Sequence, residues 1–518
     1  MGKRLLIVGG GAAGWITAGY LARTLGAHCP DGVQIELIES EDIGILGVGE
    51  GTFPSICTTL RRIGVDETTL LRVCDASFKQ GARFSHWHRA PGEEHGAHDH
   101  YLHAFQVCRE PSGLDLLSYW LLGAAGENAA WDAVSTPQKR VADACRAPKV
   151  ITHPEFTGPL GYAYHLDAVK LAELLRGRAI ASGVKHIVDT VTAVNLTASG
   201  TIKSVYTGNH GEICADLYID CSGFRALLIG KALGVPYKSC ATSLFCDRAL
   251  TVRIPYADRN IPVPSYTIAT AQEAGWMWDI SLADRRGIGY VYSSAHTDDA
   301  RAEHTLRRYV DIQSNAEVEA RKISFETGYR EISWKKNCIA IGLSSGFFEP
   351  LEATGIMLCE LGAVSLSNLF PWGGDIEIAA RQFNELMRKR YERALDFIKL
   401  HYCLTERKDS AFWRDNVLSD SIPDSLQDRL LRWRHRPPSS IDIDANVDIF
   451  PESSWQYVLY GMGYQTDITE RGPILKYHAE AREAFAEIQR QADFALKVLP
   501  TNRELLDAVQ KRPIGVNA

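Results

Sequence analysis

The hydrophobic pattern of the chain is most distinctive at its start. Residues 5–8 are four consecutive aliphatic residues, as is typical of a buried parallel strand. Three glycines follow in the G-x-G-x-x-G spacing, namely Gly9, Gly11 and Gly14. An apolar helical stretch over residues 15–25 comes next, and residues 34–39 form a second predicted strand that ends in Glu39. This order predicts one strand–helix–strand unit of the dinucleotide-binding type.

Each glycine of that spacing has its own physical role. The first permits the tight turn, the second lets the backbone approach a pyrophosphate, and the third lets the helix pack closely on the strand. The N–H groups that open the helix would face the pyrophosphate. Glu39 is placed to accept a hydrogen bond from a ribose hydroxyl.

The pattern farther along the chain predicts that this module is discontinuous. Residues 216–224 read as a strand with a glycine turn, and residues 337–342 read as another buried strand. A helix is expected over residues 162–181 and a pair of strands within residues 183–193. The expected fold class is therefore α/β, a doubly wound, Rossmann-like, three-layer module with β-rich insertions. From residue 376 onward, apolar residues recur every three to four positions, which predicts a mostly helical C-terminal region.

Two further segments look functional. The loop at residues 44–55 holds many glycines and ends in a proline, so it is either a strap lying over the cofactor or a surface turn. Residues 346–356 precede a predicted helix at residues 356–369, and the backbone N–H groups of Thr354 and Gly355 would open it. Such a helix start is either an anion site or an ordinary cap.

Alternation also predicts a hairpin. Residues 275–282 and 287–294 each alternate bulky apolar residues with other residues, and the polar turn 283–286 would join them.

Composition narrows the function classes. The formal net charge of −7 argues against nucleic acid and anionic membranes as partners. The twelve cysteines show no C-x-x-C spacing, which indicates reduced thiols of a cytoplasmic protein. Lys3 and Arg4 precede an uncharged run that resembles a signal peptide or a membrane span, but five glycines weaken such a helix. We expect a soluble protein.

Six histidines lie between His86 and His103, which raises the question of a metal site. No H-x-x-x-H spacing and no cysteine partner accompany them, so we expect an exposed loop and no metal. His103 alternates with aromatic residues as in a strand, so it and Phe105 are candidates to face a pocket.

Taken together, these segments resemble the flavin-dependent tryptophan halogenases over nearly the whole chain. Besides the first glycine turn, the resemblance rests on four segments: Gly47-Val48-Gly49-Glu50, Ser77-Phe78-Lys79, residues 275–280 and residues 348–355. The family hallmark is Trp-x-Trp-x-Ile-Pro, which keeps the substrate from the flavin. This chain has Trp276, Trp278 and Ile280, but Ser281 replaces the proline.

The resemblance implies an enzyme that oxidises halide to hypohalous acid at FAD and then halogenates an indole-like small molecule. FADH2 would come from a separate flavin reductase, and the halide would be chloride or bromide, held near Thr354 and Gly355. Lys79 would hydrogen-bond the hypohalous acid or form a haloamine, while Glu352 would polarise the electrophile or accept the ring proton. The implied cofactor contacts are Gly9, Gly11, Ala12, Ala13, Gly14, Glu39, Gly49, Glu50, Gly342 and Ile356.

The resemblance also implies a division of the chain. The FAD-binding module would comprise residues 1–65, 155–235 and 325–370, the β-rich substrate and halogenation layer residues 66–154 and 236–324, and the helical substrate-side region residues 371–518. A homodimer is compatible with the sequence. Two other functions stay open, an FAD-dependent aromatic hydroxylase and a non-catalytic flavoprotein.

One departure bears on the substrate. Where tryptophan-specific members carry a Tyr-Tyr pair that holds the amino acid, this chain has Trp455 and Gln456. We therefore expect an aromatic slot of His103, Phe105 and Trp455, and a preference for indole over free tryptophan.

Overall fold

The computed structural model describes residues 3–44, 47, 49–92, 99–314 and 319–511. These residues form two compact units, each assembled from three stretches of the chain. Unit 1 consists of Met1–Ala76, Leu166–Cys240 and Glu326–Glu392, and unit 2 of Ser77–His165, Ala241–Phe325 and Arg393–Ala518. Helix α10 (Ile376–Cys403) contributes residues to both. That these units act as flavin module and halogenation layer stays a prediction.

Unit 1 is built on a six-stranded sheet in the order β20-β21-β12-β1-β2-β8. The strands are β20 (Trp334–Lys335), β21 (Cys338–Ala340), β12 (Leu217–Asp220), β1 (Arg4–Val8), β2 (Gln34–Glu39) and β8 (Lys185–Val188). All neighbours are parallel except the edge pair β20–β21. Helix α1 (Ala12–Thr24) connects β1 to β2 and packs on both strands. The predicted strand–helix–strand unit is confirmed, because its periodicity is local to the sequence.

Helices and a second, smaller sheet pack against the six-stranded sheet of unit 1. Helix α1 packs against α7 (Ala168–Ala181) and α9 (Thr354–Asn368). Apolar residues of β1 and β12 share a buried cluster with Ile202 and Val205 of a separate three-stranded sheet. That sheet is β11 (Gly211–Ile213), β10 (Ile202–Thr207) and β9 (Val191–Leu196). The remaining elements are α2 (Ser55–Ile63), α3 (Glu67–Val73), β3 (Glu50–Gly51), β13 (Lys238–Ser239), β19 (Gly328–Tyr329) and β22 (Gly346–Phe347).

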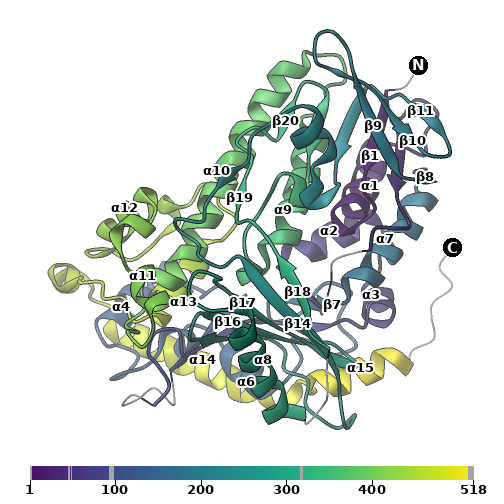
Figure 1. Cartoon of the computed structure of the whole chain (residues 1–518). Coiled ribbons are helices and arrows are strands. Elements are labelled where there is room, and N and C mark those ends of the chain that lie inside the picture. The colour runs from purple at the N-terminus through teal and green to yellow at the C-terminus, as the bar shows by residue number, and fades with distance from the viewer. Residues whose placement is uncertain (1–2, 45–46, 48, 93–98, 315–318, 512–518) are drawn as a thin grey trace. The chain divides into compact units, whose positions relative to one another are not determined.

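Unit 2 is built on a seven-stranded sheet in the order β18-β14-β17-β16-β15-β5-β6. The strands are β18 (Arg321–Ser324), β14 (Arg248–Pro255), β17 (Arg285–Tyr292), β16 (Gly275–Ser281), β15 (Thr267–Gln272), β5 (Gly81–Ser85) and β6 (His100–Ala104). Helix α8 (Asp299–Ser314) packs on β14 and β17 (Figure 1). Every second residue of these strands faces it, for example Leu250, Val252 and Ile254, as the period of two requires. The predicted hairpin is confirmed, but Arg285 and Arg286 belong to β17 and not to the turn.

The other elements of unit 2 are mostly helical. They are β4 (Ser77–Lys79), α4 (Leu116–Leu121), α5 (Trp131–Val134), α6 (Gln138–Asp143), α11 (Ala411–Asn416), α12 (Asp424–Trp433), α13 (Glu452–Gly461), α14 (His478–Val498) and α15 (Asn502–Lys511). Pro500 follows α14, as expected for a residue that cannot continue a helix. The predicted helical C-terminal region is confirmed.

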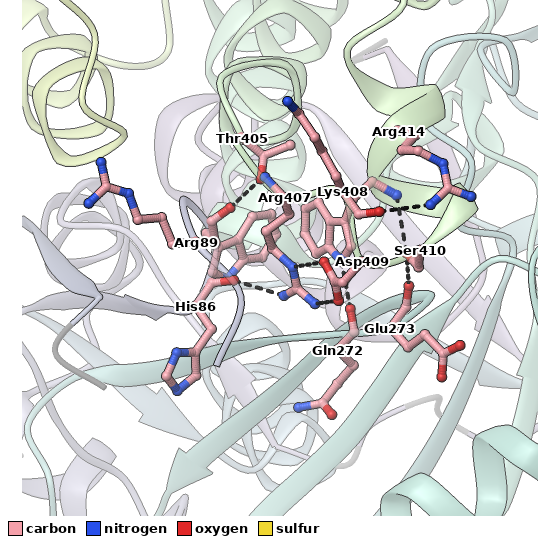
Figure 2. A network of polar contacts seen from close by, with 12 residues as sticks. His86, Arg89, Gln272, Glu273, Thr405, Arg407, Lys408, Asp409, Ser410 and Arg414 are labelled. Carbon is pink, nitrogen blue, oxygen red and sulfur yellow. Dashed lines mark hydrogen bonds and ion pairs between the residues drawn. The ribbon is translucent and has the colours of Figure 1, made fainter. Parts of the chain in front are cut away.

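A polar network fastens the segment after α10 to the sheet of unit 2 (Figure 2). The Arg407 guanidinium donates two hydrogen bonds to Asp409 and one to the carbonyl of His86 at 2.8 Å, and it lies 4.6 Å from the ring of Trp413. Trp413 Nε1 in turn donates to the carbonyl of Gln272, where β15 ends. The turn of the β15–β16 hairpin is therefore held by Trp413, whose ring packs against a buried arginine that binds Asp409 with two hydrogen bonds.

One sequence expectation is wrong in its bounds, and another is refined by the sheet topology. The helix expected over residues 162–181 begins only at Ala168, because Ala163–Leu166 form strand β7 and pair antiparallel with β4. Asp167 accepts the N–H groups of Val169 and Lys170 and so caps the helix there. Strands β8 and β9 exist as expected but belong to different sheets.

Within the described part of the chain, no helix combines the length and apolar character that a membrane crossing needs.

Candidate functional site

The first glycine turn has the shape that a dinucleotide needs. Gly9 has φ +119°, and a Cβ there would lie 2.2 Å from the carbonyl oxygen of Cys221. A Cβ on Gly14 would lie 1.9 Å from the carbonyl oxygen of Gly9, whereas one on Gly11 would meet nothing within 4 Å. The first and third glycines are thus required by packing, and the second faces open space at the start of α1. This is the arrangement into which a pyrophosphate fits.

Glu39 lies next to this turn and has several protein partners. Its carboxylate contacts His186 Nε2 at 2.8 Å, Trp15 Nε1 at 3.4 Å and Arg176 at 3.7 Å. A Cβ on Gly10 would overlap the Glu39 carboxylate, so the acid lies directly against the turn. Its contact with a ribose stays a prediction.

Two of the implied cofactor residues meet although they are far apart in sequence. Gly342 has φ +81°, and a Cβ there would lie 2.6 Å from the Cβ of Ala13. The turn after β21 therefore packs on the first turn of α1, next to Ala12 and Gly14. Ile356 follows on α9 and is 9% exposed.

The strap segment is described only in part, since residues 45, 46 and 48 lie outside the described residues. Gly49 has φ +146°, a conformation that side chains rarely adopt. Glu50 follows and is half-buried. Burial, and then the negative charge of Asp167, raises the pKa of Glu50 to about 7. A neutral carboxyl at this position would tolerate an anionic cofactor better than a carboxylate would.

The start of α9 is strained. Glu352 and Ala353 have φ +64° and +56°, in the left-handed region that non-glycine residues avoid. Helix α9 begins directly afterwards at Thr354, and a Cβ on Gly355 would meet nothing within 4 Å. Two consecutive strained residues cost of order 1–3 kcal/mol each, and such strain gathers at functional sites. The backbone around Thr354 and Gly355 therefore begins a helix directly after a strained turn, and an anion bound there stays a prediction.

In unit 2, Lys79 ends strand β4 and is 2% exposed. Its Nζ lies 5.3 Å from the ring centroid of Phe105. His165, opposite Ser77 on strand β7, lies close enough for the Lys79 charge to act on it. Burial lowers the pKa of His165 well below its usual value, and the positive charge of Lys79 lowers it further. The lysine thus lies in a dry environment beside an aromatic ring and a neutral imidazole.

The predicted pocket residues also belong to unit 2. His103 is 0% exposed, its ring centroid is 6.2 Å from that of Phe105, and its Nε2 lies 2.8 Å from Ser454 Oγ. Trp455 follows Ser454 and is 1% exposed. The ring of Phe397 packs against both His103 and Trp455, with centroid distances of 5.7 Å and 4.9 Å. The structure therefore gathers these three residues into one aromatic cluster.

The tryptophan motif lies on β16. Trp276, Trp278 and Ile280 are 2%, 8% and 6% exposed. The Trp278 ring covers Gly289 on β17, where a Cβ would lie 2.1 Å from a ring carbon. The carbonyl of Ser281 accepts a hydrogen bond from the Ser77 hydroxyl on β4. The backbone carbonyl at position 281, which a proline would also offer, therefore ties this motif to the strand of Lys79.

Sequence reasoning missed two buried groups. Glu360 of α9 accepts hydrogen bonds from Thr59 Oγ1 and Ser55 Oγ of α2, and burial raises its pKa to about 8. A glutamate inside a strongly apolar helix was the available signal. The second is Gln138, described below, for which the sequence offered no signal.

Part of the histidine run, including His95 and His98, lies outside the described residues. Among residues that are described, no group of three or more His, Cys, Asp or Glu side chains is arranged to hold a metal ion.

Comparison with known proteins agrees with this geometry. The family model for tryptophan halogenase matches residues 4–473. The tryptophan 6-halogenase SttH of Streptomyces toxytricini is 35% identical over 98% of both chains. The tryptophan 7-halogenase RebH of Lentzea aerocolonigenes is 32% identical over 97% of this chain and 98% of its own.

Solved structures give the same result. A tryptophan halogenase from Shewanella frigidimarina NCIMB 400 superimposes with a TM-score of 0.93 at 42% identity, covering 98% of this chain and 97% of its own. Tar14, a tryptophan C-6 flavin-dependent halogenase from taromycin biosynthesis, reaches 0.90 at 34% identity, with 98% and 100% covered. The chain therefore belongs to the flavin-dependent tryptophan halogenases, enzymes that use a halide and FADH2 supplied by a separate reductase.

Proposed function

We propose that Lys79 delivers the halogen to an indole-like ring bound in unit 2. One observation carries the proposal, the almost complete burial of a lysine whose Nζ lies 5.3 Å from an aromatic ring. A lysine is rarely buried without a reason, because removing an ammonium from water is costly. Beside Phe105, a flat ring would find both a stacking partner and a proton donor.

The chemistry divides between the cofactor and the chain. When bound, reduced flavin supplies, with oxygen, the oxidation of halide to hypohalous acid. Lys79 donates a proton or hydrogen bond to the oxygen of that acid, or carries the halogen as a haloamine. The halogen then bonds to a ring carbon as its bond to oxygen or nitrogen breaks, and Glu352 accepts the ring proton.

The halide would bind at the start of α9. The N–H groups of Thr354 and Gly355 lie at the positive end of the helix dipole, which favours an anion. The strained backbone at Glu352 and Ala353, directly before the helix, supports this assignment because such strain clusters at ligand-binding and active sites.

Replacing Lys79 with Met tests the proposal. The variant keeps the apolar stem but lacks the amine, so we expect halogenated indole to fall by at least about 100-fold. Flavin reoxidation should stay near the wild-type rate, because the amine acts after hypohalous acid is made. Product is measured by mass spectrometry with reduced FAD, oxygen and bromide.

Lys399 offers the matched control. It is 0% exposed, and its Nζ lies 5.0 Å from the ring of Phe245 and 2.8 Å from Asn416 Oδ1, so Lys399→Met removes an equally buried ammonium. That variant should still halogenate. Near-normal product from Lys79→Met would mean that freely diffusing hypohalous acid is the agent.

The setting of the enzyme is also proposed. All twelve cysteines are free thiols, which supports a reducing compartment such as the cytoplasm. FADH2 would pass from the reductase by diffusion or brief contact. A homodimer is tested by light scattering of the purified protein.

A further inference from the structure

Gln80, the residue after Lys79, is completely buried and links two parts of the proposed site. Its backbone N–H donates to the carbonyl of Ser265 at 2.6 Å. Its carbonyl accepts the N–H of Phe105 at 3.0 Å. One residue thus joins the backbone of the lysine to the backbone of the aromatic residue beside its ammonium.

A second buried amide braces this connection. Gln138, the first residue of α6, is 0% exposed. Its Nε2 donates to the carbonyl of Gly161 at 2.6 Å and to Gln80 Oε1 at 3.4 Å, and its Oε1 accepts the N–H of Gln106 at 2.6 Å. A single carboxamide therefore bonds three chain segments that are far apart in sequence.

Each bonded residue is the sequence neighbour of the lysine, of the ring beside its ammonium, or of a ring that packs on the residue before the lysine. The pairs are Gln80 with Lys79, Gln106 with Phe105, and Gly161 with Tyr162. The ring of Tyr162 packs edge-on against Phe78, with centroids 5.3 Å apart. The side chain of Gln138 thus bonds three residues, each of which is the direct sequence neighbour of Lys79, Phe105 or Tyr162.

The side chains of the two glutamines that Gln138 bonds make further hydrogen bonds of their own. Gln106 Oε1 accepts the N–H of Gly161 at 2.8 Å, and Gln80 Nε2 donates to the carbonyl of Arg146 at 2.8 Å and to Ser265 Oγ at 2.9 Å. Because every buried polar atom left unpaired costs free energy, a satisfied amide network favours one arrangement of the segments that it joins.

We propose that Gln138 is a positioning residue that sets the place of the Lys79 amine relative to the ring of Phe105. It does so through Gln80 and through the main chain at residues 106 and 161, without touching substrate. The inference rests on the proposed role of Lys79. It predicts that Gln138 decides where on the substrate ring the halogen arrives and how much hypohalous acid is lost.

Two variants test this inference. Gln138→Leu removes all three hydrogen bonds, and Gln138→Glu keeps the shape and the bond from Gln106 but cannot donate. With indole, bromide and reduced FAD, we expect bromoindole per FADH2 consumed to fall about 10- to 100-fold, because small misplacements have effects of that size. We also expect the ratio of bromoindole isomers to change. A loss of folded protein would reduce all isomers equally and leave their ratio unchanged.

Gln427→Leu is the control, since Gln427 Nε2 also donates to two carbonyls, those of Ser419 and Ile422, at 3.1 and 2.8 Å. It should leave both the yield and the isomer ratio as in the wild type. If Gln138→Leu does not fold, Gln138→Glu alone carries the test. Wild-type yield and isomer ratio in a folded Gln138 variant would overturn the inference, even where Lys79→Met is inactive. An active Lys79→Met would instead overturn the proposed function.

Discussion

At the scale of single residues, the proposed FAD site depends most clearly on the missing side chain of Gly11. The space around its missing Cβ is open, while the glycines on either side of it in the motif are enclosed by backbone. Valine at position 11 would occupy the space in which a pyrophosphate must lie. Overpacking of this kind costs about 1–3 kcal/mol, which corresponds to about 5- to 150-fold weaker FAD binding.

Fluorescence titration of Gly11→Val with FAD measures this loss. Gly177→Val is the control, because Gly177 lies exposed on α7 and its Cβ would also meet nothing within 4 Å. Unchanged FAD affinity in Gly11→Val would place the cofactor elsewhere.

At the scale of secondary-structure elements, Glu360 joins α9 to α2. The hydrogen bonds from Ser55 and Thr59 tie the helix that follows the strap to the helix that carries the proposed halide site. With a pKa of about 8 in the folded protein, the carboxyl of Glu360 is mostly protonated below pH 8. The bond between the two helices is therefore formed by a neutral carboxyl.

This raised pKa makes stability depend on pH in a definite direction. Between about pH 4.5 and pH 8 the folded state holds a proton that the unfolded state has lost, so the free energy of unfolding falls as pH rises. Glu360→Gln removes this dependence. We expect it to be near neutral at pH 5 and stabilising by about 3 kcal/mol at pH 8, since one pKa unit corresponds to about 1.4 kcal/mol.

Urea unfolding at both pH values measures the difference. Glu385→Gln is the control, because Lys389 holds the pKa of exposed Glu385 below its usual value, so its loss should not stabilise at pH 8. Equal effects of Glu360→Gln at pH 5 and pH 8 would contradict the assignment.

At the scale of the whole molecule, we expect the composition of the aromatic cluster to govern the choice of substrate. Arg429, the cation that lies 4.8 Å from the Trp455 ring, already contacts Asp448 at 3.5 Å and Asp396 at 3.9 Å. It is therefore not available to a substrate carboxylate. A zwitterion whose charges find no partner in the aromatic cluster is disfavoured by a few kcal/mol.

We therefore expect kcat/KM for indole to exceed that for L-tryptophan by at least about tenfold, as a difference of 1.4 kcal/mol gives. Steady-state rates with bromide and both substrates measure the ratio. A clear advantage for tryptophan would show that its ammonium and carboxylate are bound after all, and Trp455 would then need another role.

The sequence alone determined the features whose causes are local. The strand–helix–strand unit, the β16–β17 hairpin and the C-terminal helices follow from periodicity within about 15 to 30 residues, and the glycine spacing fixes a turn. The residues proposed for catalysis, Lys79 and Glu352, were named from the resemblance of their segments to the halogenase family. Their roles stay predictions.

The tertiary structure decided the strand pairing and the hydrogen bonds that join residues far apart in the sequence. Strand β7 forms inside an apparent helix because β4 pairs with it, and His165 then lies near Lys79. The Gln138–Gln80 bond spans 58 positions and the Ser55–Glu360 bond spans 305. Polar side chains such as these have no periodicity of their own, so only the folded chain shows that they are buried, paired and placed beside the site.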